Sequence, residues 1–257
     1  MQTRPNTPLP LGAQLQDNGI NFSLFSRHAT SVSLLLFDKA TDAVSSRSIL
    51  LDIEQNKTGD IWHIWIEDLR PGCLYAWQVD GPDEPAQGHR FNSQKILLDP
   101  YAVALAGTEC WNFGRLCDGE PSGDLTQTDA DAMAKCLVPA CNFDWQGVQA
   151  PRLAWADTII YETHVRGLTV DPSSAVSHAG TFRGLTEKLP YLKELGITAI
   201  ELLPIQDFFE NELTVRNPAT GEQLRNYWGY STVAFFAPKE HYACGGTPGS
   251  QINEFKT

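Results

Sequence analysis

The sequence has no cluster of lysine and arginine side chains, and its charge balance is strongly acidic. Its 257 residues include 19 Lys and Arg against 31 Asp and Glu, a formal net charge of −12. A surface that binds nucleic acid needs clustered cations to meet phosphate, so we expect no nucleic-acid partner. The acidity also disfavours an anionic membrane surface or a highly anionic substrate. A neutral ligand fits this charge most easily.

Long apolar runs are missing as well. The opening stretch MQTRPNTPLPLGAQLQDNG contains nothing like the apolar region of a signal peptide. No segment approaches the roughly 18 uninterrupted apolar residues that indicate a membrane span. We therefore expect no membrane partner and a cytoplasmic location.

Metal-binding and familiar catalytic motifs are also absent. The six cysteines form no C-x-x-C pair, the close spacing that zinc and redox sites favour: Cys73, Cys110, Cys117, Cys136, Cys141 and Cys244. There is no G-x-S-x-G, P-loop, G-x-G-x-x-G or H-E-x-x-H motif. We expect free thiols of a cytoplasmic protein, with no metal and no cofactor.

Short strands fill the first hundred residues. GINFSLFS alternates Ile20, Phe22 and Leu24 with polar residues, which is the period-two pattern of a half-buried strand. SVSLLLFD, DIWHIWIEDL and RPGCLYAWQVDG repeat this pattern, and Pro71–Gly72 marks a turn. Strands separated by Pro, Gly, Asp and Asn predict an antiparallel β-sandwich over residues 1–106.

The pattern changes after residue 106. The polar, acidic stretch DGEPSGDLTQTDADAMAK predicts a surface loop, and we assign residues 107–155 to a linker that wraps one domain onto the next. DTIIYETHV and ITAIELLP predict two buried strands. Between them, TFRGLTEKLPYLKELG predicts a helix that Pro190 kinks or splits and that Gly196 ends. This order predicts a βαβ unit with parallel strands.

The predicted βαβ unit occupies a short segment. TPGSQINEFKT predicts the start of a further helix with Ser250 as its N-cap. A (β/α)₈ barrel takes roughly 250 residues, whereas residues 156–257 provide 102. We therefore expect residues 156–257 to form only the start of such a barrel.

Strings along nearly the whole chain resemble the glycogen-debranching, isoamylase-type members of the α-amylase superfamily, family 13 of the glycoside hydrolases. LGAQLQDNGINFSLFSRHATSVSLLLFD resembles the opening of their immunoglobulin-like β-sandwich, a family 48 carbohydrate-binding module. WADTIIYETHVRGLT resembles their first barrel strand, and ELLP belongs to a string that resembles the second. NYWGYSTVAFFAPKEHYA resembles the loop that follows. The resemblance implies a sandwich followed by the first βαβ part of a (β/α)₈ TIM barrel.

The resemblance also implies a role for the aromatic stretch RNYWGYSTVAFFAP. In this superfamily the tyrosine after the glycine of that loop forms a stacking platform for a glucose ring, and here it is Tyr230. An aromatic face attracts the C–H groups of a pyranose and excludes water. Trp228 could bind substrate or pack, and Asn226 could hydrogen-bond a sugar or fix the loop. Phe235 and Phe236 we expect in a core.

Other residues keep two interpretations each. His164 and Arg166 follow the first barrel strand, where they could bind substrate or orient a loop. Trp62, Trp65 and Trp77 could line a glycan surface, but an alternating strand buries one face in any case, so we expect core packing.

Two carboxylates invite a catalytic assignment that the resemblance does not support. Glu162 and Glu201 lie near the ends of neighbouring strands, and retaining glycosidases hold two carboxyl groups roughly 5 to 5.5 Å apart. The family, however, places its nucleophilic Asp on the fourth strand, its acid/base Glu on the fifth and a further Asp on the seventh. We therefore expect no catalytic residue in this chain, with Glu162 and Glu201 buried and paired.

The function that the resemblance implies is hydrolysis of α-1,6 branch linkages in glycogen or a related branched α-glucan, with retention and without a cofactor. Because the expected carboxylates are missing, we expect the chain alone to be inactive. A non-catalytic α-glucan-binding module and a truncated, inactive gene product remain alternatives. A branching or trehalose-forming relative fits the motifs less well, and the sequence predicts no oligomeric state.

We expect the sandwich half to be better ordered than residues 157–257, because an incomplete barrel exposes unpaired sheet edges and apolar helix faces. Limited proteolysis should leave a compact core confined to the N-terminal half. A single compact core that includes residues 157–257 would contradict this expectation.

Overall fold

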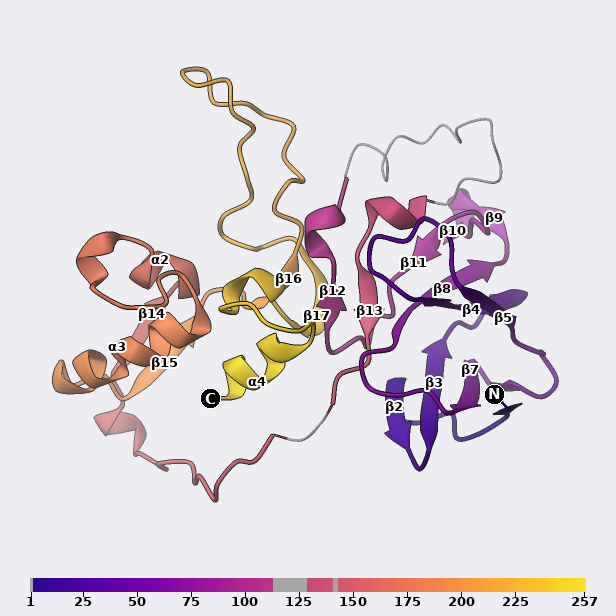
Figure 1. Ribbon diagram of the computed structural model, residues 1–257, viewed down its shortest axis with the longest axis horizontal. Coiled ribbons are helices and arrows are strands. Elements are labelled where there is room, and N and C mark those ends of the chain that lie inside the picture. The colour runs from indigo at the N-terminus through magenta and orange to yellow at the C-terminus, as the bar shows by residue number, and fades with distance from the viewer. Residues whose placement is uncertain (1, 113–128, 141–142) are drawn as a thin grey trace.

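The computed structural model describes residues 2–112, 129–140 and 143–257. Figure 1 shows a β-rich part at the N-terminal side, a smaller α/β part, and the C-terminal elements β17 and α4 between them. Within the described ranges, no helix combines the length and apolar character needed to cross a bilayer. Most of the predicted surface loop, and also Cys117 and Cys141, lie outside the described residues.

The N-terminal part is an antiparallel sandwich, as predicted. One sheet runs in the order β1–β7–β3–β2, with β6 paired to β7, and the other in the order β12–β13–β8–β4–β5, with β11 paired to β8. The strands of the first sheet are β1 (Thr3–Arg4), β2 (Gly12–Gln16), β3 (Gly19–Phe25), β6 (Lys57–Thr58) and β7 (Ile61–Glu67). Those of the second are β4 (Ser31–Phe37), β5 (Arg47–Leu50), β8 (Leu74–Asp80), β11 (Ile96–Leu97), β12 (Leu105–Ala106) and β13 (Lys135–Leu137). The short hairpin β9 (Asp83–Glu84) and β10 (His89–Arg90) follows β8.

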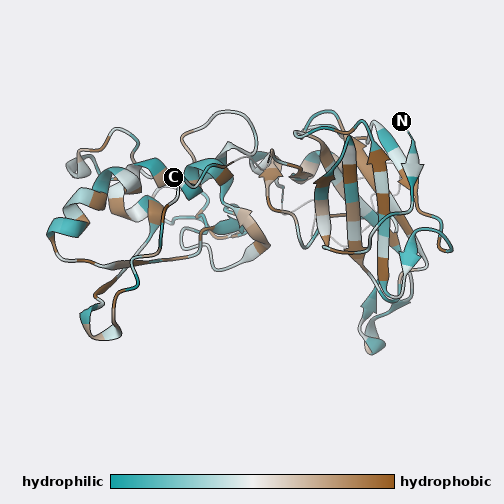
Figure 2. Cartoon of the chain, turned by 90° about the horizontal axis from the view of Figure 1, so that it is seen from below, coloured by the Kyte–Doolittle hydropathy of each residue, from teal (hydrophilic) through white to brown (hydrophobic). Residues whose placement is uncertain are grey.

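Large apolar side chains fill the space between the two sheets. Figure 2 shows hydrophobic positions recurring along the sandwich strands. Trp62 and Trp77 are fully buried in this core, so the prediction of core packing is confirmed for them. Trp65 is 5% exposed but lies outside the core cluster, and the Arg4 guanidinium lies 4.2 Å from the centre of its ring. The Trp62 indole donates to the Ser26 carbonyl, and the Trp77 indole donates to the Asp99 carboxylate at 3.2 Å. None of the three therefore offers a ring face to a glycan.

The segment assigned to a linker contributes to the sandwich. Strand β13 (Lys135–Leu137) pairs with β8 and with β12, so part of residues 107–155 belongs to the second sheet. The Lys135 ammonium is buried and donates to the carbonyls of Ala40, Ala130 and Met133. Because these carbonyls satisfy the charge, a polar-looking stretch can enter the core. The wider division at residues 106 and 155 remains a prediction.

The second half begins with the predicted βαβ unit. Strands β14 (Ile160–Thr163) and β15 (Ala199–Leu202) are parallel, and the helices α2 (Val165–Thr169) and α3 (Phe182–Glu194) lie between them in sequence. The antiparallel pair β16 (Gln206–Phe208) and β17 (Thr232–Pro238) follows, and α4 (Ser250–Lys256) ends the chain. Short 3₁₀ turns lie at Pro85–Gln87, Thr108–Cys110, Asp129–Ala132, Trp155–Asp157, Pro172–Ser174 and Glu240–Tyr242.

Helix α3 shows why local sequence signals located it well. The Thr181 hydroxyl caps its first turn by accepting from the Gly184 amide. At its end, Gly196 has a φ of +91° and its amide bonds back to the Lys193 carbonyl. Ile197 bonds to the Leu192 carbonyl, which completes a Schellman motif. Pro190 lies inside one continuous helix, so the predicted split is wrong, whereas the predicted kink stays a prediction. Proline removes one donor, and the motifs at both ends still define the helix.

Two local predictions in this half are wrong. Ile159 and Ile160 are 54% and 52% exposed, although their strand was predicted to be buried. Strand β14 pairs with β15 alone among the described strands, so its apolar side chains lack the layers that bury a parallel sheet. At α4 the N-cap is Gly249, in the left-handed region at a φ of +93°, and Ser250 is the first helical residue.

The two halves share packing and hydrogen bonds. Ala234 and Ala237 of β17 belong to the same buried cluster as the sandwich core. The Glu240 carboxylate accepts from the Thr108 hydroxyl at 2.8 Å and from the Thr108 amide at 3.2 Å. Gln251 donates to the Leu105 carbonyl from the start of α4. Strand β17 is therefore fixed against the sandwich.

The Thr108–Glu240 contact predicts a pH-dependent stability. Burial raises the pKa of Glu240, and the hydrogen bonds from Thr108 oppose that rise only in part. An acid whose folded pKa is raised loses native-state stability as the pH rises from its unfolded to its folded pKa. The difference in urea midpoint between Glu240→Gln and the unmodified chain should therefore be more positive at pH 7 than at pH 4.

The matched variant Glu240→Ala leaves both Thr108 donors without this acceptor and should cost about 1–2 kcal/mol at pH 4. The cost should be smaller at pH 7, where the variant also removes the buried charge. Equal urea midpoints for the Gln variant and the unmodified chain at pH 7 would contradict the inferred cost of ionisation.

Candidate functional site

The aromatic loop Asn226–Tyr230, which we name the platform loop, lies beside the end of strand β14. It is the last part of the long connection between β16 and β17, which extends away from the rest of the chain in Figure 1. His164 directly follows β14 and contacts Tyr227 of the loop. In (β/α)₈ barrels this carboxyl end of the strands carries the active site. The loop thus occupies the position where function is expected.

Asn226 and Gly229 set the shape of the platform loop. The Asn226 side chain accepts from the Gly229 amide at 3.0 Å and donates to Glu212 at 2.7 Å. Gly229 has a φ of +79°, and a Cβ atom there would lie 2.8 Å from the Phe208 ring. Only glycine fits that conformation and that approach. Both polar ends of Asn226 are engaged within the protein, so the geometry favours its loop-fixing role over a sugar contact.

His164 anchors the loop to the barrel strand. Its Nδ1 accepts from the Gly167 amide at 3.0 Å, so the Nε2 proton of the neutral ring donates to the Tyr227 carbonyl at 2.9 Å. The His164 and Tyr227 rings stack at 4.6 Å with an interplanar angle of 15°, and the Tyr242 hydroxyl lies 3.0 Å from Nε2. Burial lowers the pKa of His164, with a smaller contribution from Arg166. The structure therefore supports the loop-orienting interpretation of His164.

The two rings predicted to bind substrate point into solvent from this anchored loop. Tyr230 is 71% exposed and Trp228 is 55% exposed. Trp228 meets His164 edge-on at 6.0 Å and Tyr227 at 5.9 Å, so its position is braced by two rings. Exposed aromatic faces on a fixed backbone are suited to stacking on a sugar ring. The substrate-binding role of Tyr230, Trp228 and Asn226 stays a prediction.

A network of charged side chains joins the two strands, β16 and β17, that flank the connection carrying the platform loop. The Lys239 ammonium, 1% exposed, lies 3.2 Å from Asp207 and 3.3 Å from Glu210, and it donates to the Phe208 carbonyl. Glu210 also meets His241 at 3.2 Å. The His241 hydrogen bond, assisted by Lys239, holds the pKa of Glu210 at about 2 despite burial. The same pairing raises the pKa of His241.

A small cavity of about 150 Å³ lies under the platform loop. Arg166 and Arg225 line it together with Glu210, Phe208, Asn226, Tyr227 and Tyr242. Neither Tyr230 nor Trp228 is part of its lining. A sugar stacked on the exposed rings would therefore lie outside this cavity, on the surface of the loop.

The two carboxylates considered for catalysis are not buried as predicted. Glu162 and Glu201 occupy the same register position of the parallel pair β14 and β15, and both are exposed. The sandwich does not cover this sheet, so water reaches both side chains. No hydrogen bond or ion pair connects either side chain to the described residues.

Phe235 and Phe236 also depart from prediction, being 68% and 57% exposed. Strand β17 buries its small residues Ala234 and Ala237 against the sandwich instead. Phe236 stacks on Tyr101 of the sandwich at 5.3 Å. The core assignment for these two phenylalanines was therefore wrong.

Sequence reasoning missed Lys239, His241 and Tyr242, although their string APKEHYA was part of the resemblance. A lysine and a histidine after an apolar strand usually indicate a solvated turn. Lys239 is buried and His241 is paired because of Asp207 and Glu210, which lie about thirty residues earlier in the chain. The linear pattern carried no signal for that pairing.

The comparisons with known proteins agree with this arrangement. Residues 10–102 match the family model "Carbohydrate-binding module 48 (Isoamylase N-terminal domain)" and residues 139–243 match "Alpha amylase, catalytic domain". The chain is 39% identical over 257 residues to "Isoamylase 1, chloroplastic" of Arabidopsis thaliana. The chain belongs to the isoamylase-type group of the α-amylase superfamily. The match covers 97% of this chain and 31% of that isoamylase, so the chain spans about a third of the length of this relative.

Solved structures of similar proteins support the fold. The catalytic module of the pneumococcal glycogen-degrading virulence factor SpuA superposes with a TM-score of 0.70 at 24% identity, covering 95% of this chain and 34% of that one. The GBS pullulanase SAP, solved with maltotetraose, superposes with a TM-score of 0.70 at 24% identity, covering 98% and 31%. This isoamylase-type chain is thus a β-sandwich followed by part of a (β/α)₈ catalytic barrel.

The pKa values of two histidines near the platform loop should be shifted in opposite directions. Burial lowers the pKa of His164 below its ordinary 6.5, and Glu210 raises that of His241 above it. Following both rings by NMR across pH 4–9 measures the two values directly. Glu210→Gln should return the His241 pKa toward 6.5 and leave that of His164 unmoved.

The sign of the linked stability follows from the same shifts. Glu210 contributes stability that is lost as the pH falls toward about 2, and His241 contributes stability that is lost as the pH rises through its raised pKa. A His241 pKa at or below 6.5 in the unmodified chain would contradict the pairing.

Proposed function

We propose that this chain is the N-terminal part of a glycoside hydrolase that debranches glycogen or a related α-glucan at α-1,6 linkages. The observation that carries the proposal is Tyr230, an exposed ring on an anchored loop at the carboxyl end of the first barrel strand. The membership in the isoamylase-type group supports the choice of an α-glucan as substrate. The contribution of this chain to the reaction is to hold the glucan and not to cleave it.

The proposed reaction is a retaining hydrolysis. One carboxylate attacks the anomeric carbon while a protonated one assists the leaving oxygen, and water then resolves the covalent intermediate. The family resemblance assigns these carboxylates to later barrel strands. The residues of this chain would instead position the sugar, with the face of Tyr230 against one side of the ring. His164 and Asn226 fix the backbone that carries Tyr230.

Glucan binding is tested by titrating the chain with maltohexaose in a calorimeter. Tyr230→Ala removes the stacking face and should weaken binding about tenfold, the equivalent of about 1.4 kcal/mol. Tyr230→Phe keeps the ring and should retain most of the affinity. Tyr191→Ala is a matched control, because Tyr191 is a 56% exposed ring on α3 outside the platform loop. Equal affinities for the unmodified chain and Tyr230→Ala would exclude the platform role.

A reducing-end assay separates the enzyme from its two alternatives. Binding without release of reducing ends is expected for this chain and also for a glucan-binding module. Failure to bind glucan and to unfold cooperatively would favour an inactive gene product. The intact mass of the native protein, detected with an antibody against residues 1–100, then distinguishes the first two. A species well above 28.4 kDa supports the debranching enzyme, and a 28.4 kDa species supports the module.

A further inference from the structure

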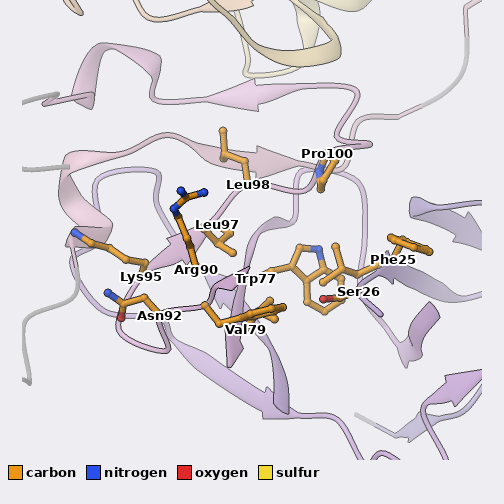
Figure 3. Close-up of a pocket in the computed structure, with 12 residues that line it drawn as sticks. Phe25, Ser26, Trp77, Val79, Arg90, Asn92, Lys95, Leu97, Leu98 and Pro100 are labelled. Carbon is orange, nitrogen blue, oxygen red and sulfur yellow. The ribbon is translucent and has the colours of Figure 1, made fainter. Parts of the chain in front are cut away.

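The sandwich contains an open pocket that is separate from the platform loop. It encloses about 370 Å³ beside strand β8, near the lower end of the size range of small-molecule sites. Its walls come from the end of β3, from Trp77 and Val79 of β8, and from residues 90–100. Figure 3 shows side chains from these segments converging on one space. No residue of the platform loop takes part in the lining.

The two ends of this pocket differ in chemistry. In Figure 3, Arg90, Asn92 and Lys95 lie together at one end, and Phe25 and Pro100 lie at the other. The lining contains cationic side chains but no carboxylate. The pocket lining is therefore positively charged, although the chain as a whole has a net charge of −12.

The buried acid Asp99, between the lining residues Leu98 and Pro100, is engaged by other partners. Asp99 accepts from Tyr75 at 2.9 Å, from Trp77 at 3.2 Å and from the Tyr101 amide at 2.8 Å. Among the described residues, no carboxylate forms an ion pair with Arg90. The guanidinium of this exposed residue is therefore available for a planar anion.

We propose that this pocket binds a small amphipathic carboxylate. The hydrocarbon body would lie against Val79, Leu97 and Leu98, and the carboxylate would meet the Arg90 guanidinium. A pyranose would place hydroxyl groups against the apolar walls and leave them without partners. A single negative charge suits the Arg90 guanidinium, whereas a highly charged anion would be repelled by the acidic chain. This proposal is independent of glucan binding at Tyr230.

Methyl NMR of the intact chain tests the proposal with decanoate as the probe, kept below its micelle concentration. Saturable shifts are expected for the methyl groups of Leu24, Val79, Leu97 and Leu98, which line the pocket. The methyl groups of Leu50, a 68% exposed residue on β5, which β4 separates from β8, are the internal control and should not move. Decanol, the neutral alcohol of the same chain length, should bind at least about fivefold more weakly than decanoate because it lacks the charge-assisted bond.

Two variants locate the site without disturbing the core. Arg90→Gln should weaken decanoate binding about fivefold or more, whereas Lys39→Gln, an exposed cation outside the pocket, should not change it. Leu97→Trp, at a 46% exposed position, should fill the pocket and abolish the shifts.

The proposal is overturned if the lining methyl groups stay unmoved, if Arg90→Gln binds decanoate as well as the unmodified chain, or if decanol binds as tightly as decanoate. Maltoheptaose moving the same methyl groups would also overturn it, in favour of a sugar site. The thermal midpoint of each variant verifies that it remains folded.

Discussion

The buried ammonium of Lys239 is the constraint on which the second half of this chain depends. A charge that is 1% exposed needs nearby anions and acceptors, and Asp207, Glu210 and the Phe208 carbonyl supply them. These partners lie on or just after β16, whereas Lys239 directly follows β17. Satisfying the ammonium therefore draws the two strands together and closes the long loop between them. The pairing of β16 and β17 around Lys239 therefore fixes the position of the platform loop.

The same strand connects the loop to the sandwich. Glu240, next to Lys239, accepts both hydrogen bonds from Thr108, and the alanines of β17 enter the sandwich core. On its other side the platform loop is held by His164 at the end of β14. The platform loop is thus held by contacts with both halves of the chain. This explains why an exposed aromatic stretch can keep one conformation in a part of the chain with little core of its own.

The exposed apolar residues of the second half have a common cause. The small cluster of Val165, Phe182, Phe208 and Tyr242 is the core that the βαβ unit shares with β16 and the turn after β17. Ile159, Ile160 and Phe235 lie outside it and are more than half exposed. In a barrel such positions are covered by neighbouring strands and helices. The chain matches about a third of the length of its isoamylase relative, so it supplies only some of those layers.

The sequence by itself determined the elements whose signals are local. Alternation of apolar and polar residues defined the sandwich strands, and the Thr181 cap and Gly196 defined the ends of α3, because each signal acts within one strand or turn. The motif strings also located the family and the aromatic loop.

Only the tertiary structure decided which side chains are buried and which are presented. Lys135 and Lys239 are buried because distant carbonyls and carboxylates meet them, and Phe235 and Phe236 are exposed because Ala234 and Ala237 face the sandwich. In the platform loop, Asn226 and His164 fix the backbone and Tyr230 stays exposed. The contact of His164 with Tyr227 joins residues far apart in sequence. Burial and pairing are properties of the assembled fold, and no local pattern encodes them.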